Sequence, residues 1–421
     1  MKITGIIAEY NPFHNGHKYH LDQARTMTGA DAVVAVISGT VTQRGEFARW
    51  NKWSRARMAV ENGVDLVLEL PYAFAVNSAE EFARGGVSIL KSLGCVTDLV
   101  FGCESDPDAV ISMARRSAEC EEDFQEAIRT GLEEGLSYPQ ARGKAMMQFW
   151  GTDSKGVDQQ QSLDQPNDIL AVEYVRQLVL QGSDMVPHGV TRLGSYHDHQ
   201  VQKIFSSATA VRKAIKEERW EDVERAVPKE TLIVLREDQS ENEMDPVRLD
   251  SIILSRLLML GPEGIRTMYG CSEGLEYRIW NSLPKARSVD ELLELTASGR
   301  YPTARIRRLL MHCLMGLTEA VFEKLKTNAN EGELFIRVLG CNETGAKLLK
   351  QIKKSEQAPV VITNLNKERK ELKELEEGNL SLAMDLRAAE IAALGRGERL
   401  YANSDFVKRP YIAHKTEKNH K

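Results

Sequence analysis

The chain has 421 residues, of which 42% are hydrophobic and 28% are charged, and its formal net charge is −6. These values are ordinary for a globular protein of two or three domains, and the negative charge on its own argues against a nucleic-acid partner. Neither a run of about 18 apolar residues nor a basic leader with an apolar core occurs, which excludes a membrane partner and predicts a cytoplasmic protein.

The first residues predict a buried strand that ends in a sharp turn. Apolar residues dominate 3–8, and Asn11-Pro12 stops the strand because proline fixes φ and has no amide donor. A helix is expected to begin at about Gly16, where the missing side chain lets the backbone approach a ligand. His14 and His17 therefore lie at the mouth of a strand-to-helix junction.

This junction is suited to phosphate. Free amide groups and the helix dipole both favour an anion at a helix amino terminus. When protonated, His14 and His17 could donate to the charge that grows on a leaving pyrophosphate during attack at an α-phosphate. The sequence has no Walker-type glycine loop with Lys-Ser/Thr, so nucleotidyl transfer is favoured over γ-phosphoryl transfer.

Two other interpretations of this motif remain open at the level of sequence. Asn15-Gly16 is also a good hairpin turn, in which the histidines would simply be solvated. A zinc pair is the second, but neither a cysteine nor a glutamate stands at ligand spacing from His14 and His17. The six cysteines are scattered without a close pair, which is typical of reduced, packed thiols, and we predict no protein-bound metal.

Three further strands are predicted downstream. Apolar runs cover 32–37, 64–70 and 96–101, and helical patterns lie between them. Strands that recur about every 30 residues with intervening helices are typical of βαβ units and a parallel sheet. Ligands of such a sheet bind beyond the carboxyl ends of its strands, where Gly102 stands, although a glycine there can also be a plain strand terminator.

The middle of the chain is predicted to be largely helical. Between Glu104 and Glu134, ten acidic residues stand against three arginines, which indicates surface helices. Asn167 lies at the start of another helix and could be no more than its cap. A fifth strand is expected at 185–190, and it leads to Arg192 and a polar strand exit.

A second phosphate candidate follows this strand. The hydroxyl groups of Ser206, Ser207 and Thr209 can cap a helix start, and Arg212, about a turn and a half into that helix, can fold back to an anion held there. Taken alone, the segment is an ordinary capped helix. Combined with the histidine turn about 190 residues upstream, it predicts one triphosphate site formed by two distant segments.

The carboxy-terminal part is predicted to be mainly helical. After an acid-rich linker at 238–245, apolar residues follow helical spacing almost throughout, apart from short strands predicted at 334–339 and 360–363. We therefore divide the chain into an α/β domain, 1–240, and a mainly helical domain, 241–421.

Basic residues gather in this second part. Residues 300–312 contain four arginines and no acidic residue, and 347–373 contains eight lysines and arginines against three acidic residues. In one predicted helix, Arg305, Arg308 and His312 fall on one side and could follow an RNA phosphate backbone. The same pattern also fits an ordinary solvated helix face.

Several motifs together resemble known families. His14-Asn15-Gly16-His17 resembles the HxGH motif of the nucleotidylyltransferase superfamily, and 206–212 resembles the ISSTxxR motif that closes the same fold. More narrowly, the chain is similar to the tRNA(Met) cytidine acetate ligase family. The stretches that carry this similarity are 9–17, 38–39, 43–46, 166–170 and 196–198.

The resemblance implies a Rossmann-like parallel-sheet nucleotidylyltransferase domain followed by a helical tRNA-binding region. It also implies an ATP-dependent ligase that forms N4-acetylcytidine at the wobble position of elongator tRNA(Met). Acetate would attack the α-phosphate of ATP, which yields acetyl-adenylate and pyrophosphate. The cytidine amine, brought out of its stack, would then take the acetyl group and release AMP. Mg²⁺ is expected to accompany the triphosphate.

Site residues follow from the matched motifs. His14 and His17 are the expected catalytic residues, and Arg305, Arg308 and His312 are expected to bind RNA. The residues expected to bind ATP are Ile7, Ala8, Glu9, Tyr10, Asn11, Pro12, Phe13, His14, Asn15, Gly16, His17, Lys18, Tyr19, His20, Gly102, Asn167, Arg192, Ser207, Thr209 and Arg212.

The sequence departs from the family at two places and leaves two alternatives. Family members tend to have a phenylalanine and a proline where Val41 and Phe47 stand, which concerns the shape of the loop after the second strand.

One alternative function is an adenylyltransferase that acts on a small phosphorylated metabolite, which would leave the basic helical half without a role. The other is a non-catalytic RNA-binding protein, which would leave the histidine motif unexplained.

Overall fold

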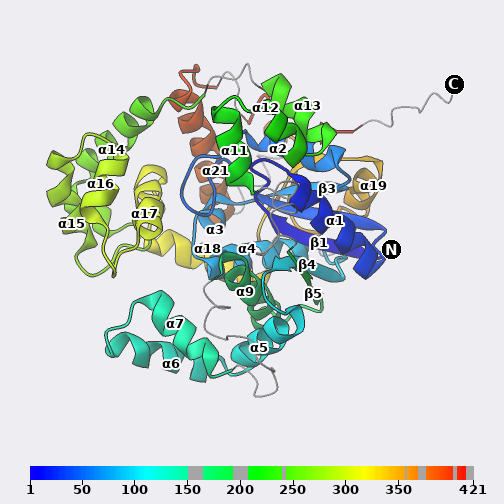
Figure 1. Ribbon diagram of the computed structural model, residues 1–421, viewed down its shortest axis with the longest axis horizontal. Coiled ribbons are helices and arrows are strands. Elements are labelled where there is room, and N and C mark those ends of the chain that lie inside the picture. Colours follow the sequence, from blue (N-terminus) through cyan, green and yellow to red (C-terminus); the bar gives the residue numbers. More distant parts are fainter. Residues whose placement is uncertain are drawn as a thin grey trace.

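The computed structural model describes residues 1–149, 165–192, 207–238, 243–355, 358–367, 376–401 and 405–413. Within these ranges the strands form one eight-stranded sheet, in the order β5-β4-β1-β2-β3-β6-β7 with β8 paired to β6. Helices cover both faces of the sheet and extend beyond it on two sides (Figure 1). The fold is mixed α/β with a mostly parallel sheet, as the sequence predicted.

The parallel part of the sheet contains the five strands expected from the apolar runs. Every residue of the central strands β2 and β3 is buried, as expected for strands that are covered on both faces. β1 pairs in parallel with β2 and β4, so the carboxyl ends of these strands meet at one edge of the sheet. The strands are β1 Ile3–Ala8, β2 Ala32–Ser38, β3 Leu66–Leu70, β4 Asp98–Cys103 and β5 Val186–Thr191.

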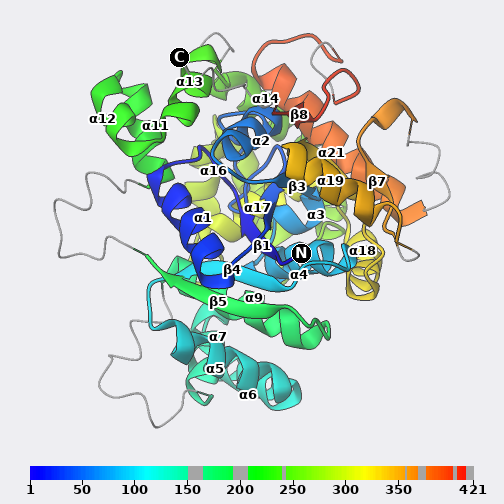
Figure 2. The same cartoon turned by 90° about the vertical axis from the view of Figure 1, so that its right-hand side faces the viewer.

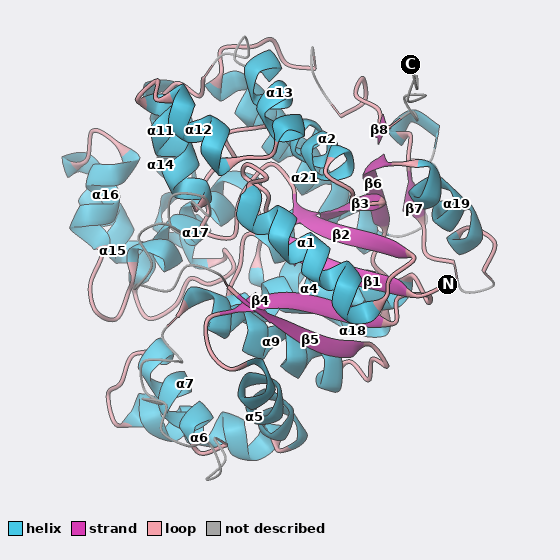
Figure 3. Cartoon of the chain, turned by 45° about the vertical axis from the view of Figure 1, so that its right-hand side comes forward, coloured by secondary structure: helices cyan, strands magenta, loops and turns pink. Residues whose placement is uncertain are grey.

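The sheet separates two hydrophobic cores. Val33 and Ala35 of β2 belong to one core, whereas Val34 and Val36 belong to the other, because successive side chains of a strand point to opposite faces. Figure 3 shows α1 lying across one face, with α4 and α9 near the opposite face. The helices around the sheet are α1 Asn15–Thr28, α2 Lys52–Glu61, α3 Tyr72–Ala75, α4 Ala79–Ser92, α9 Pro166–Leu180, α11 Ala208–Lys216, α12 Trp220–Ala226 and α13 Lys229–Glu237.

Three strands from the carboxy-terminal part continue the same sheet. β6 (Ile336–Cys341) runs antiparallel to β3, and β7 (Val361–Ile362) and β8 (Tyr411–Ile412) pair in parallel with β6. The short strands predicted in this part are therefore present, but their place in the amino-terminal sheet was not foreseen. Accordingly, part of the second half completes the α/β core, while the division of the chain at 240 and 241 remains a prediction.

The remaining helices form two groups beside the sheet and a third set from the carboxy-terminal part of the chain (Figures 1 and 2). The acidic region is helical, as predicted, and consists of α5 Pro107–Glu119, α6 Glu121–Glu133 and α7 Tyr138–Met147. The second group comprises α14 Pro246–Arg266, α15 Leu275–Ser282, a 3₁₀ turn at Leu283–Lys285, α16 Val289–Thr296 and α17 Thr303–Met315. The third set is α18 Glu319–Glu331, α19 Glu343–Ile352 and α21 Glu376–Gly395. In the ranges that the structure describes, no helix combines the length and apolar character needed to cross a membrane.

Candidate functional site

The histidine motif forms the start of α1. His14 is the residue before the first turn, and its Nδ1 accepts a hydrogen bond of 3.0 Å from the amide of Gly16. In return, Nδ1 of His17 accepts a bond of 3.2 Å from the amide of His14. This is the reciprocal arrangement of a capping box, built here from two imidazoles. The hairpin interpretation of Asn15-Gly16 is therefore wrong.

The two hydrogen bonds also fix the protonation of the imidazoles. Because each Nδ1 accepts, the proton of each neutral ring lies on Nε2, which is left to donate to a ligand. Burial, with help from Arg192, lowers the pKa of His14 to about 3, and burial with His14 nearby lowers the pKa of His17 well below its usual value. Both shifts favour the neutral rings in the ligand-free site, because two desolvated imidazoles this close repel a second charge.

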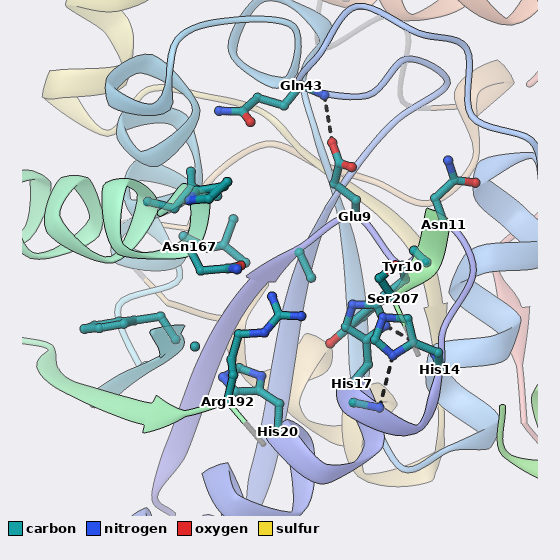
Figure 4. Close-up of a pocket in the computed structure, with 18 of the residues that line it drawn as sticks. Glu9, Tyr10, Asn11, His14, His17, His20, Gln43, Asn167, Arg192 and Ser207 are labelled. Atoms are coloured by element: carbon teal, nitrogen blue, oxygen red, sulfur yellow. Dashed lines mark hydrogen bonds between the residues drawn. The ribbon is translucent and has the colours of Figure 1, made fainter. Parts of the chain in front are cut away.

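A single cavity of about 530 Å³ lies at the carboxyl ends of β1, β4 and β5. Most of the predicted nucleotide residues line it, and Figure 4 shows His14, His17, Arg192 and Ser207 directed toward a common space. The predicted residues that line the cavity are Ile7, Ala8, Glu9, Tyr10, Asn11, His14, Gly16, His17, Tyr19, His20, Gly102, Asn167, Arg192, Ser207, Thr209 and Arg212.

Four residues of the predicted 7–20 stretch do not line this cavity. Phe13 is fully buried in a hydrophobic core, and the adjoining Pro12 sits in a cis peptide turn. The side chain of Asn15 donates to the carbonyl of Arg225. Lys18 is paired with an aspartate one helical turn further on, at the surface of α1. For Asn15 and Lys18 the reason is helix geometry, since only one side of α1 can face the cavity.

The distant Ser-Thr-Arg segment reaches the same cavity. Ser207 caps α11, with its Oγ accepting from the amide of Ala210 at 3.2 Å. Arg212 donates from Nη1 to the carbonyl of Asn11 at 2.8 Å and from Nη2 to Oγ1 of Thr209 at 3.1 Å. The prediction that the two segments meet is therefore confirmed, because both line the same cavity. Ser206 lies outside the described residues, as do 193–205.

The opposite wall is formed by the exits of β4 and β5 and the start of α9. The side chain of Arg192 passes over Gly102, close enough for ordinary contact with a Cβ placed there. Asn167 donates from its amide to the carboxylate of Glu104. The cap residue of α9 is Gln165, so Asn167 is not the helix cap that the sequence allowed.

The family model described as HIGH Nucleotidyl Transferase matches residues 1–404. Among curated relatives, the tRNA(Met) cytidine acetate ligase of Halothermothrix orenii is 39% identical over 391 residues and covers 91% of each chain. That of Clostridium kluyveri is 36% identical over 424 residues, which span 99% of this chain and all of the other. The chain belongs to the tRNA(Met) cytidine acetate ligase family.

A solved structure extends this similarity to three dimensions. The crystal structure of Thermotoga maritima TmcAL bound with alpha-thio ATP matches with a TM-score of 0.88 at 32% identity, over 98% of this chain and 99% of the other. The apo form of the same protein matches equally well. This member of the tRNA(Met) cytidine acetate ligase family therefore shares its fold with a relative that binds an ATP analogue.

The predicted RNA-binding side chains lie on α17 in this tRNA(Met) cytidine acetate ligase family member. Arg305 packs over the ring of Tyr301 and donates to Oγ of Ser272 at 2.7 Å, and Arg308 is partly buried. His312 is 2% exposed, with its Nδ1 3.3 Å from the Tyr72 hydroxyl. The prediction that it contacts RNA is wrong, because the apolar face of this helix wraps further round than its spacing suggested.

Sequence reasoning assigned no role to the loop after β2, although this loop contributes much of the cavity wall. Gln43, Arg44 and Glu46 line the cavity, and the amide of Gln43 donates to Oε1 of Glu9 at 2.7 Å. One signal was present in the sequence, because 43–46 matches a stretch of the tRNA(Met) cytidine acetate ligase family. The aromatic side chains Phe82, Phe101 and Tyr174 also line the cavity, and only the fold brings them there.

Buried Asp168 is a further residue that the sequence did not single out. Its Oδ1 accepts from the amides of Glu104 at 2.7 Å and Ser105 at 3.2 Å, and its Oδ2 accepts from the Ser105 hydroxyl at 2.5 Å. These bonds join the start of α9 to the end of β4. Asp168 thereby fixes the neighbouring Asn167 relative to Gly102.

Proposed function

We propose that this protein is an ATP-dependent ligase that acetylates the wobble cytidine of elongator tRNA(Met), with acetate as the acyl donor. One observation carries the proposal. The histidine turn and the Ser-Thr-Arg helix start, which are far apart in the sequence, line one cavity in a chain that shares its fold with an ATP-analogue-bound relative. Relatives that align along almost the whole chain carry the name tRNA(Met) cytidine acetate ligase.

The first step joins acetate to the nucleotide. An oxygen of acetate attacks the α-phosphorus of ATP, and the bond to the bridging oxygen breaks as pyrophosphate leaves. His14 and His17 donate from Nε2 to phosphate oxygens, and Arg192 and Arg212 add positive charge. A bound triphosphate raises the tendency of the imidazoles to take up a proton, since anions stabilise the charged form. Acetate is already ionised at pH 7, so positioning and charge neutralisation govern this step.

Magnesium would enter with the triphosphate. Among the described residues, no group of three or more histidine, cysteine, aspartate or glutamate side chains is arranged to hold a metal ion. Mg²⁺ commonly retains several water molecules and binds through substrate phosphates. The residues present fit that mode, in which Glu46 or Glu104 at the cavity wall would hold the hydrated ion.

The second step transfers the acetyl group to RNA. The cytidine, turned out of its stack, presents its N4 amine to the carbonyl carbon of acetyl-adenylate, and AMP leaves. Of the predicted RNA contacts, Arg305 and Arg308 remain as candidates on α17. This helix lies beside the cavity, because the backbone of Arg307 and Arg308 approaches Gly45 of the cavity loop.

The decisive experiment measures both steps with the full chain. Acetate-dependent exchange of labelled pyrophosphate into ATP reports the first step, and acetyl incorporation into tRNA(Met) transcripts reports the second. A transcript with uridine in place of the wobble cytidine is the control and should accept no acetyl group. Exchange with a phosphorylated metabolite instead of acetate would support the small-metabolite adenylyltransferase. Binding of tRNA without any exchange would support a non-catalytic RNA-binding protein.

A further inference from the structure

The cavity contains a carboxylate whose role in the first step is hard to explain by charge. Glu9 lies just beyond β1, and its Oε1 is held by the amide of Gln43 at 2.7 Å. Its backbone carbonyl accepts from Arg55 at 2.7 Å, so main chain and side chain are both fixed. In the part of the chain that the structure describes, the other carboxylate oxygen, Oε2, has no hydrogen-bond or ion-pair partner.

A fixed carboxylate disfavours the anions that this cavity would take. Triphosphate and acetate are both negatively charged, and an ionised carboxylate can only accept hydrogen bonds. Its natural partner is a neutral group that carries protons. In the proposed function that description fits the cytidine amine, which must also lose a proton when it becomes an amide.

The position of Glu9 agrees with this role. In Figure 4, Glu9 and Gln43 lie at the end of the cavity away from Arg192 and His20. The loop that holds Glu9 is in turn supported by α17, since Glu46 is paired with Arg307 and Gly45 lies against the same helix. The Glu9 end of the cavity therefore adjoins the helix that carries the candidate RNA contacts.

We propose that Glu9 is the proton acceptor of the acetyl-transfer step, and that the target cytidine enters the cavity at its Glu9 end, beside the loop 42–47. This inference rests on the proposed function and adds a catalytic residue to it. The N4 lone pair forms a bond to the acetyl carbon, the bond from that carbon to the phosphate oxygen breaks, and AMP leaves with the electron pair. The N4 proton passes to Oε2 of Glu9 and then to solvent.

The charged groups around Glu9 set its affinity for that proton. Burial raises the pKa of the Glu9 carboxyl, while the Gln43 amide and then Arg55, Arg212 and Arg44 act to lower it, and the net shift is upward. A carboxylate with a raised pKa is a better proton acceptor near neutral pH. Because the folded pKa is raised, transfer should weaken as the pH falls through it and the carboxylate becomes protonated.

The test compares the two half-reactions in Glu9→Gln. The amide keeps an oxygen that can accept from Gln43 but cannot take a proton. We expect single-turnover transfer from synthetic acetyl-adenylate to saturating tRNA to fall by about 100-fold or more, whereas acetate-dependent exchange falls by less than about tenfold. Glu9→Asp should recover part of the transfer rate. Glu133→Gln, the same charge change at an exposed position of α6, should leave the ratio of transfer to exchange near that of the wild type.

Two further results bear on the inference. The acidic fall in transfer should be present in the wild type and missing in Glu9→Gln. If exchange and transfer drop in parallel in Glu9→Gln, Glu9 serves nucleotide binding, and the inference is overturned. If the ratio of transfer to exchange in Glu9→Gln equals that of the wild type, the inference is overturned as well. Loss of exchange in the wild type itself would instead refute the proposed function.

Discussion

The imidazoles of His14 and His17 lie stacked, with ring centroids 3.7 Å apart and ring planes 26° from parallel. Each uses Nδ1 to bind an amide at the start of α1, so the same two rings cap the helix and leave Nε2 toward the cavity. In each ring, Nδ1 caps the helix and Nε2 is left to bind a ligand. This separation makes it possible to remove one task and keep the other.

His14→Asn should abolish exchange but preserve the fold. An asparagine side chain is a strong cap and can accept from Gly16, but it does not place a donor where Nε2–H stands. We expect acetate-dependent exchange to fall by about 100-fold or more with little change in the free energy of unfolding. His14→Ala is the comparison, because it also loses the cap and should cost about 1 kcal/mol of stability. Exchange near the wild-type level in His14→Asn would remove His14 from the chemistry.

A buried charge cluster leads to a prediction about stability. Lys52 and Arg337 are ion-paired with Asp405 and Glu69, at distances from 2.6 to 3.5 Å. Buried Asp385 is a third carboxyl near these two cations, and burial, with the charge of Glu69 next, raises its pKa well above the usual value. Two cations and two carboxylates already balance, so we expect Asp385 to hold its proton more strongly in the folded protein than in the unfolded chain.

Asp385→Asn should therefore become increasingly stabilising as the pH rises. The folded-state pKa of Asp385 is raised, so the wild type loses stability as the pH rises through that pKa, whereas asparagine does not titrate. Asparagine also keeps an oxygen for the amide of Tyr72, which Asp385 accepts at 2.7 Å. Urea unfolding of both proteins from about pH 6 to about pH 9 checks the prediction. A stability difference that shrinks with pH would mean that Asp385 is ionised.

Gly45→Ala should separate the cavity loop from α17. Gly45 has φ +78°, and an added Cβ would lie 3.1 Å from the backbone nitrogen of Arg308. We expect a loss of about 1–3 kcal/mol in stability and a lower rate of acetyl transfer. Gly94→Ala is the matched control, because Gly94 also has a positive φ but faces open space. Equal effects of the two changes on transfer would show that backbone strain alone, and not the contact with α17, is responsible.

Arg305→Ala should weaken tRNA binding and reduce its salt dependence. Loss of one phosphate contact lowers the slope of log affinity against log salt concentration by about one. Binding measured across a salt series checks this, and exchange without tRNA should be retained. Arg129→Ala removes an exposed arginine from α6, which belongs to the separate helical group α5 to α7, and serves as the control. If both variants have the wild-type slope, α17 is not the RNA contact.

Local features of the fold were accessible from the sequence. The apolar runs gave the four inner parallel strands β1 to β4, because strands buried on both faces need continuous apolar sequence. Gly16 and Ser207 gave the starts of α1 and α11 to within about two residues, because capping depends on residues next to each other in the chain. The burial of His312 could not be predicted from the sequence, since it depends on what packs against α17.

The sequence by itself determined the fold class, the two phosphate-oriented helix starts and the family, since each rests on a local pattern or a matched motif. Tertiary structure decided that β6 continues the sheet beside β3, that His312 is buried, and that burial lowers the pKa of both His14 and His17. It also left Oε2 of Glu9 without a partner among the described residues, while Oε1 accepts from Gln43. Burial and hydrogen-bond partners set these properties, and both depend on residues that are distant in the chain. For that reason no local pattern could specify them.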